Sequence, residues 1–229
     1  MPKDASATRD ALLHAGAHLF AAHGIDAART RDIVTLAGQG NDSAVTYHFG
    51  SRAGLLDAVL RAGITRMEPA RAAALPGLRP GDLPAITAAI VEPTADELRT
   101  EHGRDFLRIT AQLAGRAGIR DRHLPPLLRG TALQGQLELL QDACRAVHVE
   151  AIALERVSHF IAFLTAALAD RAARLPDPAP PALAHDVYTA DLTAMLTAAL
   201  RTPAPAPTRL PKHPPPNTVK TSPRGGAVR

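Results

Sequence analysis

Among its 229 residues the sequence has no tryptophan, a single cysteine and 3% aromatic residues. A single thiol, Cys144, forms no internal disulfide and supplies no paired CxxC motif for zinc. We therefore expect a protein of the reducing cytoplasm in which Cys144 is a small buried apolar residue. No run of about 18 uncharged apolar residues is present, so we expect no membrane-spanning helix and no membrane partner.

The motifs of common enzyme classes are also missing. We find no glycine-rich phosphate loop and no nucleophile motif. His14 and His18 lie four residues apart on one face of an expected helix, and Asp10 extends that row. Because no third or fourth ligand is evident, we expect solvated histidines on the exposed side of that helix, with no metal and no cofactor. An enzyme built from helices is an alternative class without positive support.

Basic residues outnumber acidic ones by 26 to 22, but the excess is confined to one end of the chain. Residues 1–68 carry seven of each sign, whereas residues 203–229 carry five basic residues and no acidic one. This tail is rich in proline, so we expect it to be disordered. It either adds non-specific DNA affinity or is an inert extension. The net charge therefore does not show that the folded part binds DNA.

Alanine and leucine are abundant, and both favour helices. We predict an all-α fold in three parts: short helices in residues 1–68, longer helices in residues 69–202, and the tail in residues 203–229. Residues 69–80 contain prolines and glycines and are expected to connect the first two parts. In the second part we expect helices at about 82–100, 103–118, 126–146, 149–174 and 182–201, with Pro93 kinking or restarting the first.

The first part contains a predicted helix-turn-helix. Apolar residues at helical spacing predict a helix at about 5–22, followed by helices at about 30–37, 42–48 and 52–67. The two short helices are joined by a glycine-containing turn, which is the geometry of a helix-turn-helix. The second of them, with Asn41 as its expected N-cap, can enter the major groove of DNA and present its first residues to base edges.

Side chains suited to phosphate flank this second short helix. Helix N-termini present free N–H groups and a partial positive charge, so phosphates bind there. Such groups begin two helices and end the recognition helix: Thr30 and Arg31, Ser51 and Arg52, and Tyr47 with His48. Arg31 as a solvated surface residue stays an alternative.

The run from Arg31-Asp-Ile through Ala37-Gly38 to Tyr47-His-Phe-Gly-Ser-Arg52 resembles the DNA-binding domain of the tetracycline-repressor (TetR) family. The resemblance covers about the first quarter of the chain. It implies an N-terminal three-helix DNA-binding domain followed by a C-terminal helical ligand-binding and dimerisation domain. Such a protein binds a palindromic DNA operator as a homodimer and is released by a small-molecule effector.

The resemblance also implies roles for single residues. Thr30 matches a hydroxyl that contacts phosphate, and Arg31 matches a base reader. The remaining matched positions are Asp42 and Ser43 at the base-facing start of the recognition helix, Tyr47 and His48 on the DNA backbone, Arg52 as a phosphate clamp, and Phe49 in the core. The chain departs from the family at Thr46, where a backbone-contacting Tyr is usual, and at Gly54, where an acidic residue usually completes a capping box.

Two alternatives stay open for this region. A carboxylate at Asp42 repels phosphate unless it accepts from a cytosine amine, so Asp42 is either a base reader or an additional cap. A helical dimer that binds a protein partner without DNA is the alternative function, for which Asp42 and Thr46 leave room.

The second part is expected to bind the effector and to form the dimer. Residues that could line a pocket, each with a core or surface role as the alternative, are Phe106, Arg108, Gln112, Phe160, Phe163 and Tyr188. The last two expected helices carry more apolar residues than one small domain needs for its own packing. Pairing with a second copy would bury this surface in a four-helix bundle with two-fold symmetry.

Overall fold

The computed structural model describes residues 2–116, 124–175 and 183–204, and within these ranges it contains helices and no strand. The all-α prediction is confirmed. Most of the predicted tail, residues 205–229, lies outside the described ranges. The helices are α1 (Pro2–His23), α2 (Thr30–Leu36), α3 (Ala44–Phe49), α4 (Arg52–Ala74), α5 (Leu83–Asp96), α6 (Glu101–Leu113), α7 (Ala132–Arg145), α8 (Glu150–Arg174) and α9 (His185–Arg201).

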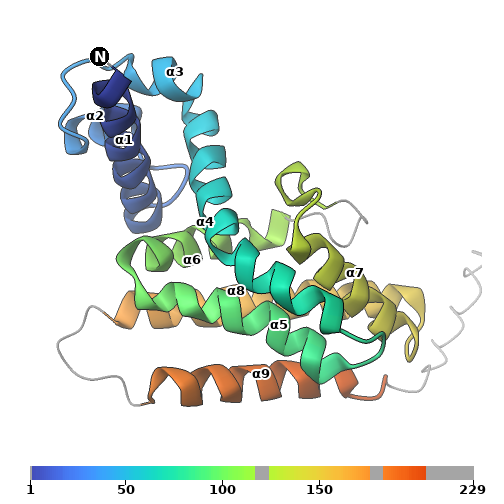
Figure 1. The fold of residues 1–229 in the computed structure, drawn as a ribbon. Helices are drawn as coiled ribbons and strands as arrows, with labels where there is room; N and C mark the ends of the chain where they lie inside the picture. Colours follow the sequence, from blue (N-terminus) through green and yellow to red (C-terminus); the bar gives the residue numbers. More distant parts are fainter. Residues whose placement is uncertain (1, 117–123, 176–182, 205–229) are drawn as a thin grey trace, which may run out of the picture.

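Helices α1, α2 and α3 form a small unit at one end of α4, and the other end of α4 enters a larger bundle (Figure 1). The small unit has one apolar core, in which Leu12, Ile33 and Val45 are fully buried. Helices α1 and α4 approach closely because Gly16 has no side chain. A Cβ atom at this position would lie 2.8 Å from Cδ2 of Leu55.

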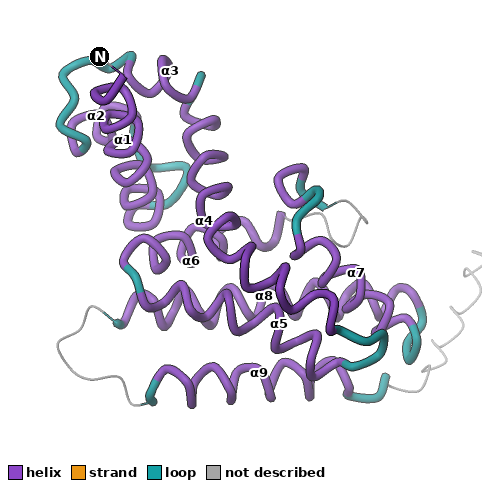
Figure 2. The backbone as a smooth tube through the Cα atoms, in the orientation of Figure 1, coloured by secondary structure: helices purple, strands orange, loops and turns teal. Residues whose placement is uncertain are grey.

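Helix α4 continues well beyond its predicted end at Met67 and passes through Pro69. Proline removes the helical hydrogen bond to the carbonyl four residues earlier, which here belongs to Thr65. Thr65 and Pro69 are both exposed, so water can satisfy that carbonyl. As a result α4 is one continuous rod from the small unit to the bundle (Figure 2).

The bundle consists of the second half of α4 and helices α5 to α9. Helix α8 contacts α6, α7 and α9, and α5 contacts α4, α7 and α9. Helix α5 runs from Leu83 to Asp96 through Pro93, so the predicted restart at Pro93 does not occur. Cys144 is fully buried, as predicted, and burial raises the pKa of its thiol.

By length and composition alone, α8 would also meet the requirements of a membrane-spanning helix, which the sequence analysis did not anticipate. In the structure one face of α8 is packed into the bundle through Val157, Phe160 and Leu164. Phe163, at the side of this face, is 41% exposed. This distribution is that of an amphipathic core helix with a second apolar side.

Candidate nucleic-acid interface and effector cavity

The helix-turn-helix is formed by α2, the turn after it, and α3. Gly38 has a φ of +68°, a left-handed conformation that glycine adopts without strain. Oδ1 of Asn41 accepts hydrogen bonds from the backbone N of Ser43 at 2.9 Å and from Oγ of Ser43 at 2.8 Å. This local pairing places the start of α3 at Ala44, later than the predicted start at Asp42.

Helix α3 has one face in the core and one face in solvent. Val45 is fully buried, whereas Tyr47 is 81% exposed. Asp42, Ser43 and Thr46 are exposed as well. The ring of Tyr47 is therefore outside the core and accessible to a binding partner.

The neighbouring predicted contacts differ in their accessibility. Arg31 is exposed, Thr30 is partly buried at the start of α2, and His48 is partly buried beside Tyr47. The rings of Tyr47 and His48 meet edge to face, with centroids 4.9 Å apart. Thr30 and Arg31 thus lie at the start of α2, whereas Tyr47 and His48 lie in the second half of α3.

Arg52, the predicted phosphate clamp, makes contacts within the small unit itself. Its Nε donates to the carbonyl of Ala28 at 2.9 Å, and its guanidinium lies over the ring of Phe20 at 5.1 Å. Its Nη2 is buried and has no partner among the described residues. Arg52 thus fixes the segment that precedes α2 against the start of α4.

The missing acidic residue at Gly54 has a structural explanation. The backbone N of Gly54 donates to Oγ of Ser51 at 3.0 Å, so Ser51 caps α4 without a capping box. A Cβ atom at Gly54 would lie 2.0 Å from the carbonyl oxygen of Phe49. The end of α3 is so close to the start of α4 that a side chain at this position would force the backbone to shift.

Two cations of this face were missed by the sequence analysis. Arg29 is exposed directly before α2, and Arg9 is exposed on α1 with its guanidinium 5.0 Å from the ring centre of Phe49. The position of Arg29 next to Thr30 could have been noticed in the sequence. The position of Arg9 depends on the packing of α1 against α3, which no local pattern reveals.

A second candidate site is a cavity of about 480 Å³ inside the bundle. This volume lies within the usual range for small-molecule sites. Helices α4, α5, α6, α7 and α8 all line it, mostly with apolar side chains. The lining residues are Ala53, Leu56, Asp57, Leu60, Ile64, Met67, Arg71, Ile90, Thr94, Phe106, Thr110, Leu113, Ala114, Pro125, Leu127, Leu128, Leu133, Leu137, Ile161, Leu164 and Thr165.

Arg71 is the cationic side chain in this lining, and it is only 2% exposed. Its Nη2 donates to Oγ1 of Thr94 at 2.9 Å, while its Nε and Nη1 are buried without a partner among the described residues. Burial lowers the pKa of Arg71 to about 10, and the charges of Glu68 and Glu97 oppose that shift. The guanidinium therefore carries its charge at neutral pH.

Among the predicted pocket residues on α6, Phe106 lines the cavity. Gln112 instead joins the bundle to the small unit, because its Oε1 accepts from the backbone N of Ile25 at 2.8 Å and its Nε2 donates to the carbonyl of Phe20 at 3.1 Å. Arg108 is partly buried and does not line the cavity.

The other three predicted pocket residues lie elsewhere in the bundle. Phe160 is buried in the core, and Phe163 is exposed on the outer face of α8. The hydroxyl of Tyr188 donates to the carbonyl of Ala167 at 3.0 Å, and its ring lies under Arg171, so Tyr188 joins α9 to α8. Aromatic residues in this chain thus serve packing more than the cavity.

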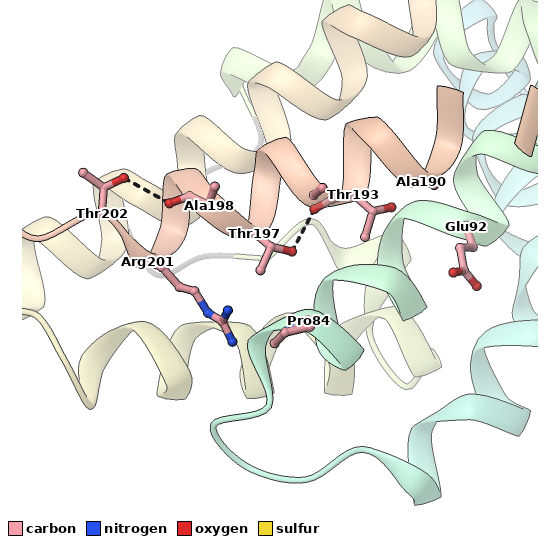
Figure 3. A pocket seen from close by; sticks show the side chains of 9 residues that line it. Pro84, Glu92, Ala190, Thr193, Thr197, Ala198, Arg201 and Thr202 are labelled. Carbon is pink, nitrogen blue, oxygen red and sulfur yellow. Dashed lines mark hydrogen bonds between the residues drawn. The ribbon is translucent and has the colours of Figure 1, made fainter. Parts of the chain in front are cut away.

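A larger and more open groove of about 720 Å³ runs along α9 and α5 (Figure 3). Its polar side chains include Thr193, Thr197 and Thr202. Their hydroxyls donate to carbonyls of their own helix, at 2.8 Å for Thr197 and 3.0 Å for Thr202, as the dashed lines in Figure 3 show. With its hydroxyl protons already engaged, this groove is a weaker candidate than the cavity.

His14 and His18 of α1 are exposed, as the sequence analysis predicted, but they also contact α6. The ring of His14 stacks on that of His102 of α6, with centroids 4.2 Å apart, and Nδ1 of His18 lies 3.6 Å from Oδ2 of Asp105. Burial raises the pKa of the Asp105 carboxyl group. No group of three or more potential ligands is arranged for a metal in the part of the chain that the structure describes. These residues form a joint between the small unit and the bundle.

Comparisons with known proteins agree with the geometry of the small unit. Residues 12–59 match the model of the bacterial regulatory proteins of the tetR family. The match extends from α1 through α2 and α3 into α4. No curated protein matches the sequence.

Several solved structures resemble the chain at low identity. A protein named provisionally as a TetR-family transcriptional regulator from Rhodococcus sp. is 17% identical, with 85% of this chain and 99% of that chain covered and a TM-score of 0.47. A protein named provisionally as a transcriptional regulator from Streptomyces coelicolor is 23% identical, with 84% and 96% covered and a TM-score of 0.48. A gamma-butyrolactone receptor is 20% identical, with 85% and 98% covered and a TM-score of 0.47.

Proposed function

We propose, from the match of residues 12–59 to the tetR family of bacterial regulatory proteins, that this chain is a repressor that binds a palindromic operator as a homodimer and leaves it when a small molecule occupies the bundle. The match over the small unit supports a DNA-binding transcriptional regulator over an enzyme. We place it in the cytoplasm, where its DNA partner is found. Residues 1–68 would read DNA, and residues 69–202 would dimerise and bind the effector.

The observation that supports DNA binding most directly is the orientation of α3. Val45 anchors the helix in the core, while Thr46 and the 81% exposed Tyr47 face away from it. A helix held in this way can enter the major groove of DNA as a rigid body. Asp42 and Ser43, at its start, would then meet base edges.

Contacts to phosphate would surround this helix. Thr30 at the start of α2, Tyr47 and His48 at the end of α3, and Nη1 of Arg52 would fix the protein on the DNA backbone. Arg31 is exposed beside them and is the strongest candidate for a specific contact to guanine.

The proposed DNA contacts are tested by selecting bound sequences from random oligonucleotides and then measuring binding of variants. Arg31→Ala should relax specificity at one base pair of each half-site, with a loss of about 1–3 kcal/mol on the selected site. Tyr47→Ala should weaken binding to all sequences equally, and its exposure protects the fold from the change. Arg79→Ala, an exposed residue of the bundle, serves as the control. Selection of no DNA at all would contradict the proposal.

The dimer is supported by apolar surface on the last two helices. Phe163 on α8 and Val187 and Met195 on α9 are 41%, 55% and 46% exposed, and α8 and α9 pack side by side. Symmetric pairing of these faces would bury the surface and place two recognition helices one turn of DNA apart, about 34–36 Å. Light scattering after gel filtration should give twice the 24.1 kDa of the chain, and Phe163→Asp should give the monomer.

Release from DNA would depend on α6, which belongs to both regions. Phe106 and Thr110 line the cavity, whereas Gln112 holds the carbonyl of Phe20 and the backbone N of Ile25 in the small unit. A molecule that fits the cavity better when α6 is displaced would therefore shift the small unit and lower operator affinity. Gln112→Ala should weaken this coupling and leave binding of the effector itself unchanged.

A further inference from the structure

We propose that the effector is an apolar molecule that carries one carboxylate, and that this carboxylate pairs with Arg71 inside the bundle cavity. The role of this molecule as an effector rests on the proposed function, whereas its binding to the cavity does not require DNA. Its basis is a buried cation that the protein leaves incompletely paired, in a cavity that is otherwise apolar.

Arg71 lines the cavity and is otherwise buried, with 2% of its surface exposed. One of its nitrogens reaches Oγ1 of Thr94, and the hydroxyl proton of Thr94 is given to the carbonyl of Ile90 at 2.6 Å. The other two nitrogens have no partner among the described residues. A buried charge without hydrogen-bond partners is strongly unfavourable, so a native structure supplies a partner, either an ordered water or a bound molecule.

The nearby carboxylates do not supply that partner. Glu97 is engaged by Arg66, which donates to it through Nε and Nη2. Oε1 of Glu68 accepts from the backbone N of Ala132 at 2.7 Å, and its Oε2 is buried without a hydrogen-bond partner among the described residues but forms no ion pair with Arg71. No ion pair joins Arg71 to an acidic side chain in the described part of the chain, although the charges of both glutamates act to raise the pKa of Arg71.

The remaining polar side chains of the lining make their own contacts. Asp57 pairs with Arg61 at 2.7 Å, and the hydroxyls of Thr110 and Thr165 donate to carbonyls of their own helices at 2.9 and 2.8 Å. The rest of the lining is apolar, as at Leu60, Ile64 and Phe106. The cavity thus offers one set of free donors with positive charge and a long apolar wall.

These features select the chemistry of the occupant. A carboxylate matches the guanidinium in charge and in planar geometry, and it accepts charge-assisted hydrogen bonds. A neutral ester or alcohol would accept a hydrogen bond but would leave the charge of Arg71 unpaired. A small hydrophilic anion would pair with Arg71 but would leave the apolar wall of the 480 Å³ cavity uncovered.

Calorimetric titration of the full chain without DNA tests the inference. The probes are octanoate, decanoate, dodecanoate and naphthoate, each compared with its methyl ester, with acetate as the hydrophilic anion. We expect the best carboxylate to bind about ten- to a hundredfold more tightly than its ester, because hydrogen bonds to a charged group contribute that much. Equal affinities of acids and esters, or no binding by any probe, would overturn the inference.

Variants locate the binding site. Arg71→Gln should remove the preference for acids over esters, Arg71→Lys should keep part of it, and Thr94→Val should reduce it only slightly. Arg79→Gln, on the surface of the bundle, is the matched control and should leave it unchanged. If Arg71→Gln fails to fold, the comparison of Arg71→Lys with Thr94→Val still decides. An unaltered preference in all Arg71 variants would contradict the site.

A second readout separates this inference from the proposed function. The carboxylate that binds best should release the selected operator DNA from the wild type and not from Arg71→Gln. Carboxylates that bind through Arg71 without releasing DNA would support the site and refute effector control. Release by neutral molecules alone would support effector control and refute the role of Arg71.

Discussion

The two regions joined by α4 each contain a buried arginine, and the two arginines differ in how fully the protein pairs them. At the start of the helix, Arg52 donates to the carbonyl of Ala28 and lies over the ring of Phe20. Toward its end, Arg71 is more deeply buried and has one partner, Thr94. Both side chains have buried nitrogens without a partner among the described residues, one in Arg52 and two in Arg71.

From this difference we infer that Arg52 stabilises the fold, whereas Arg71 binds a ligand. Arg52 connects the segment before α2 to the start of α4, so it maintains the DNA-reading unit itself. Arg71 lines a cavity and connects few elements. The two residues should therefore respond with opposite sign when their charge is removed, and the predictions below test that contrast.

The largest effect is expected for Arg52→Ala. The variant loses a charge-assisted hydrogen bond and a cation–π contact, which together should lower the free energy of unfolding by about 2–3 kcal/mol. Chemical denaturation measures this value. Arg61→Ala on the same helix is the control, because its exposed ion pair with Asp57 should contribute less than about 0.5 kcal/mol. A wild-type stability for Arg52→Ala would remove the structural role assigned to Arg52.

A somewhat smaller loss is expected for Gly54→Glu, which restores the acidic residue usual in the family. The new Cβ would meet the carbonyl oxygen of Phe49, so the variant should lose about 1–2 kcal/mol despite the added capping box. Gly40→Ala is the control, because a Cβ there has nothing within 4 Å. An increase in melting temperature for Gly54→Glu would show that this contact relaxes easily.

The opposite sign is expected for Arg71→Met in the protein without ligand. Removing an incompletely paired buried charge should leave stability unchanged or raise it by about 1 kcal/mol. Arg171→Met is the matched control: Arg171 is also buried, but it donates to the carbonyl of Leu183 at 2.7 Å and stacks on Tyr188, so its loss should destabilise. Thermal unfolding of both variants measures the contrast. A clear destabilisation by Arg71→Met would mean that Arg71 is structural.

The sequence predicted the small unit more accurately than the bundle. Helix α2 begins at Thr30 as predicted, because a short amphipathic helix between glycine breaks leaves a strong local pattern. The extent of α4 was missed, because Pro69 was taken as the start of a connection. Pro69 deprives the carbonyl of Thr65 of its helical partner, and the exposure of Thr65, which lets water satisfy that carbonyl, is a tertiary property that the sequence does not show.

The residues of the DNA-reading face were accessible to sequence analysis, because they are contiguous. The cavity was not, because its lining comes from five helices. Of the six predicted pocket residues, four of them aromatic, Phe106 alone lines the cavity, while Tyr188 joins two helices. Arg71 has no local signal at all, since an arginine in a helix is usually exposed and its burial arises from the packing of α5 and α7 against α4.

The joint between the two regions contains a further buried charge, and the smallest effect is expected there. Asp105 of α6 is 7% exposed and faces α1, where Nδ1 of His18 lies 3.6 Å away. Burial raises the pKa of its carboxyl group above the ordinary value of 3.8, while the charges of His18 and Arg108 act in the opposite direction. Folding therefore favours the protonated form of Asp105.

For a carboxyl group whose pKa is raised by folding, the contribution to stability is most favourable below the ordinary pKa and is lost as pH rises through the raised value. Asp105→Asn removes this dependence, because the amide does not ionise. The variant should be equal to or slightly more stable than the wild type at neutral pH, and this advantage should shrink as pH falls toward 3.8. Melting temperatures of both proteins across this range, with exposed Asp82→Asn as the control for acid effects elsewhere, measure the difference. An advantage that instead grows with acidity would mean that the pairing of Asp105 with His18, and not its burial, dominates at the joint.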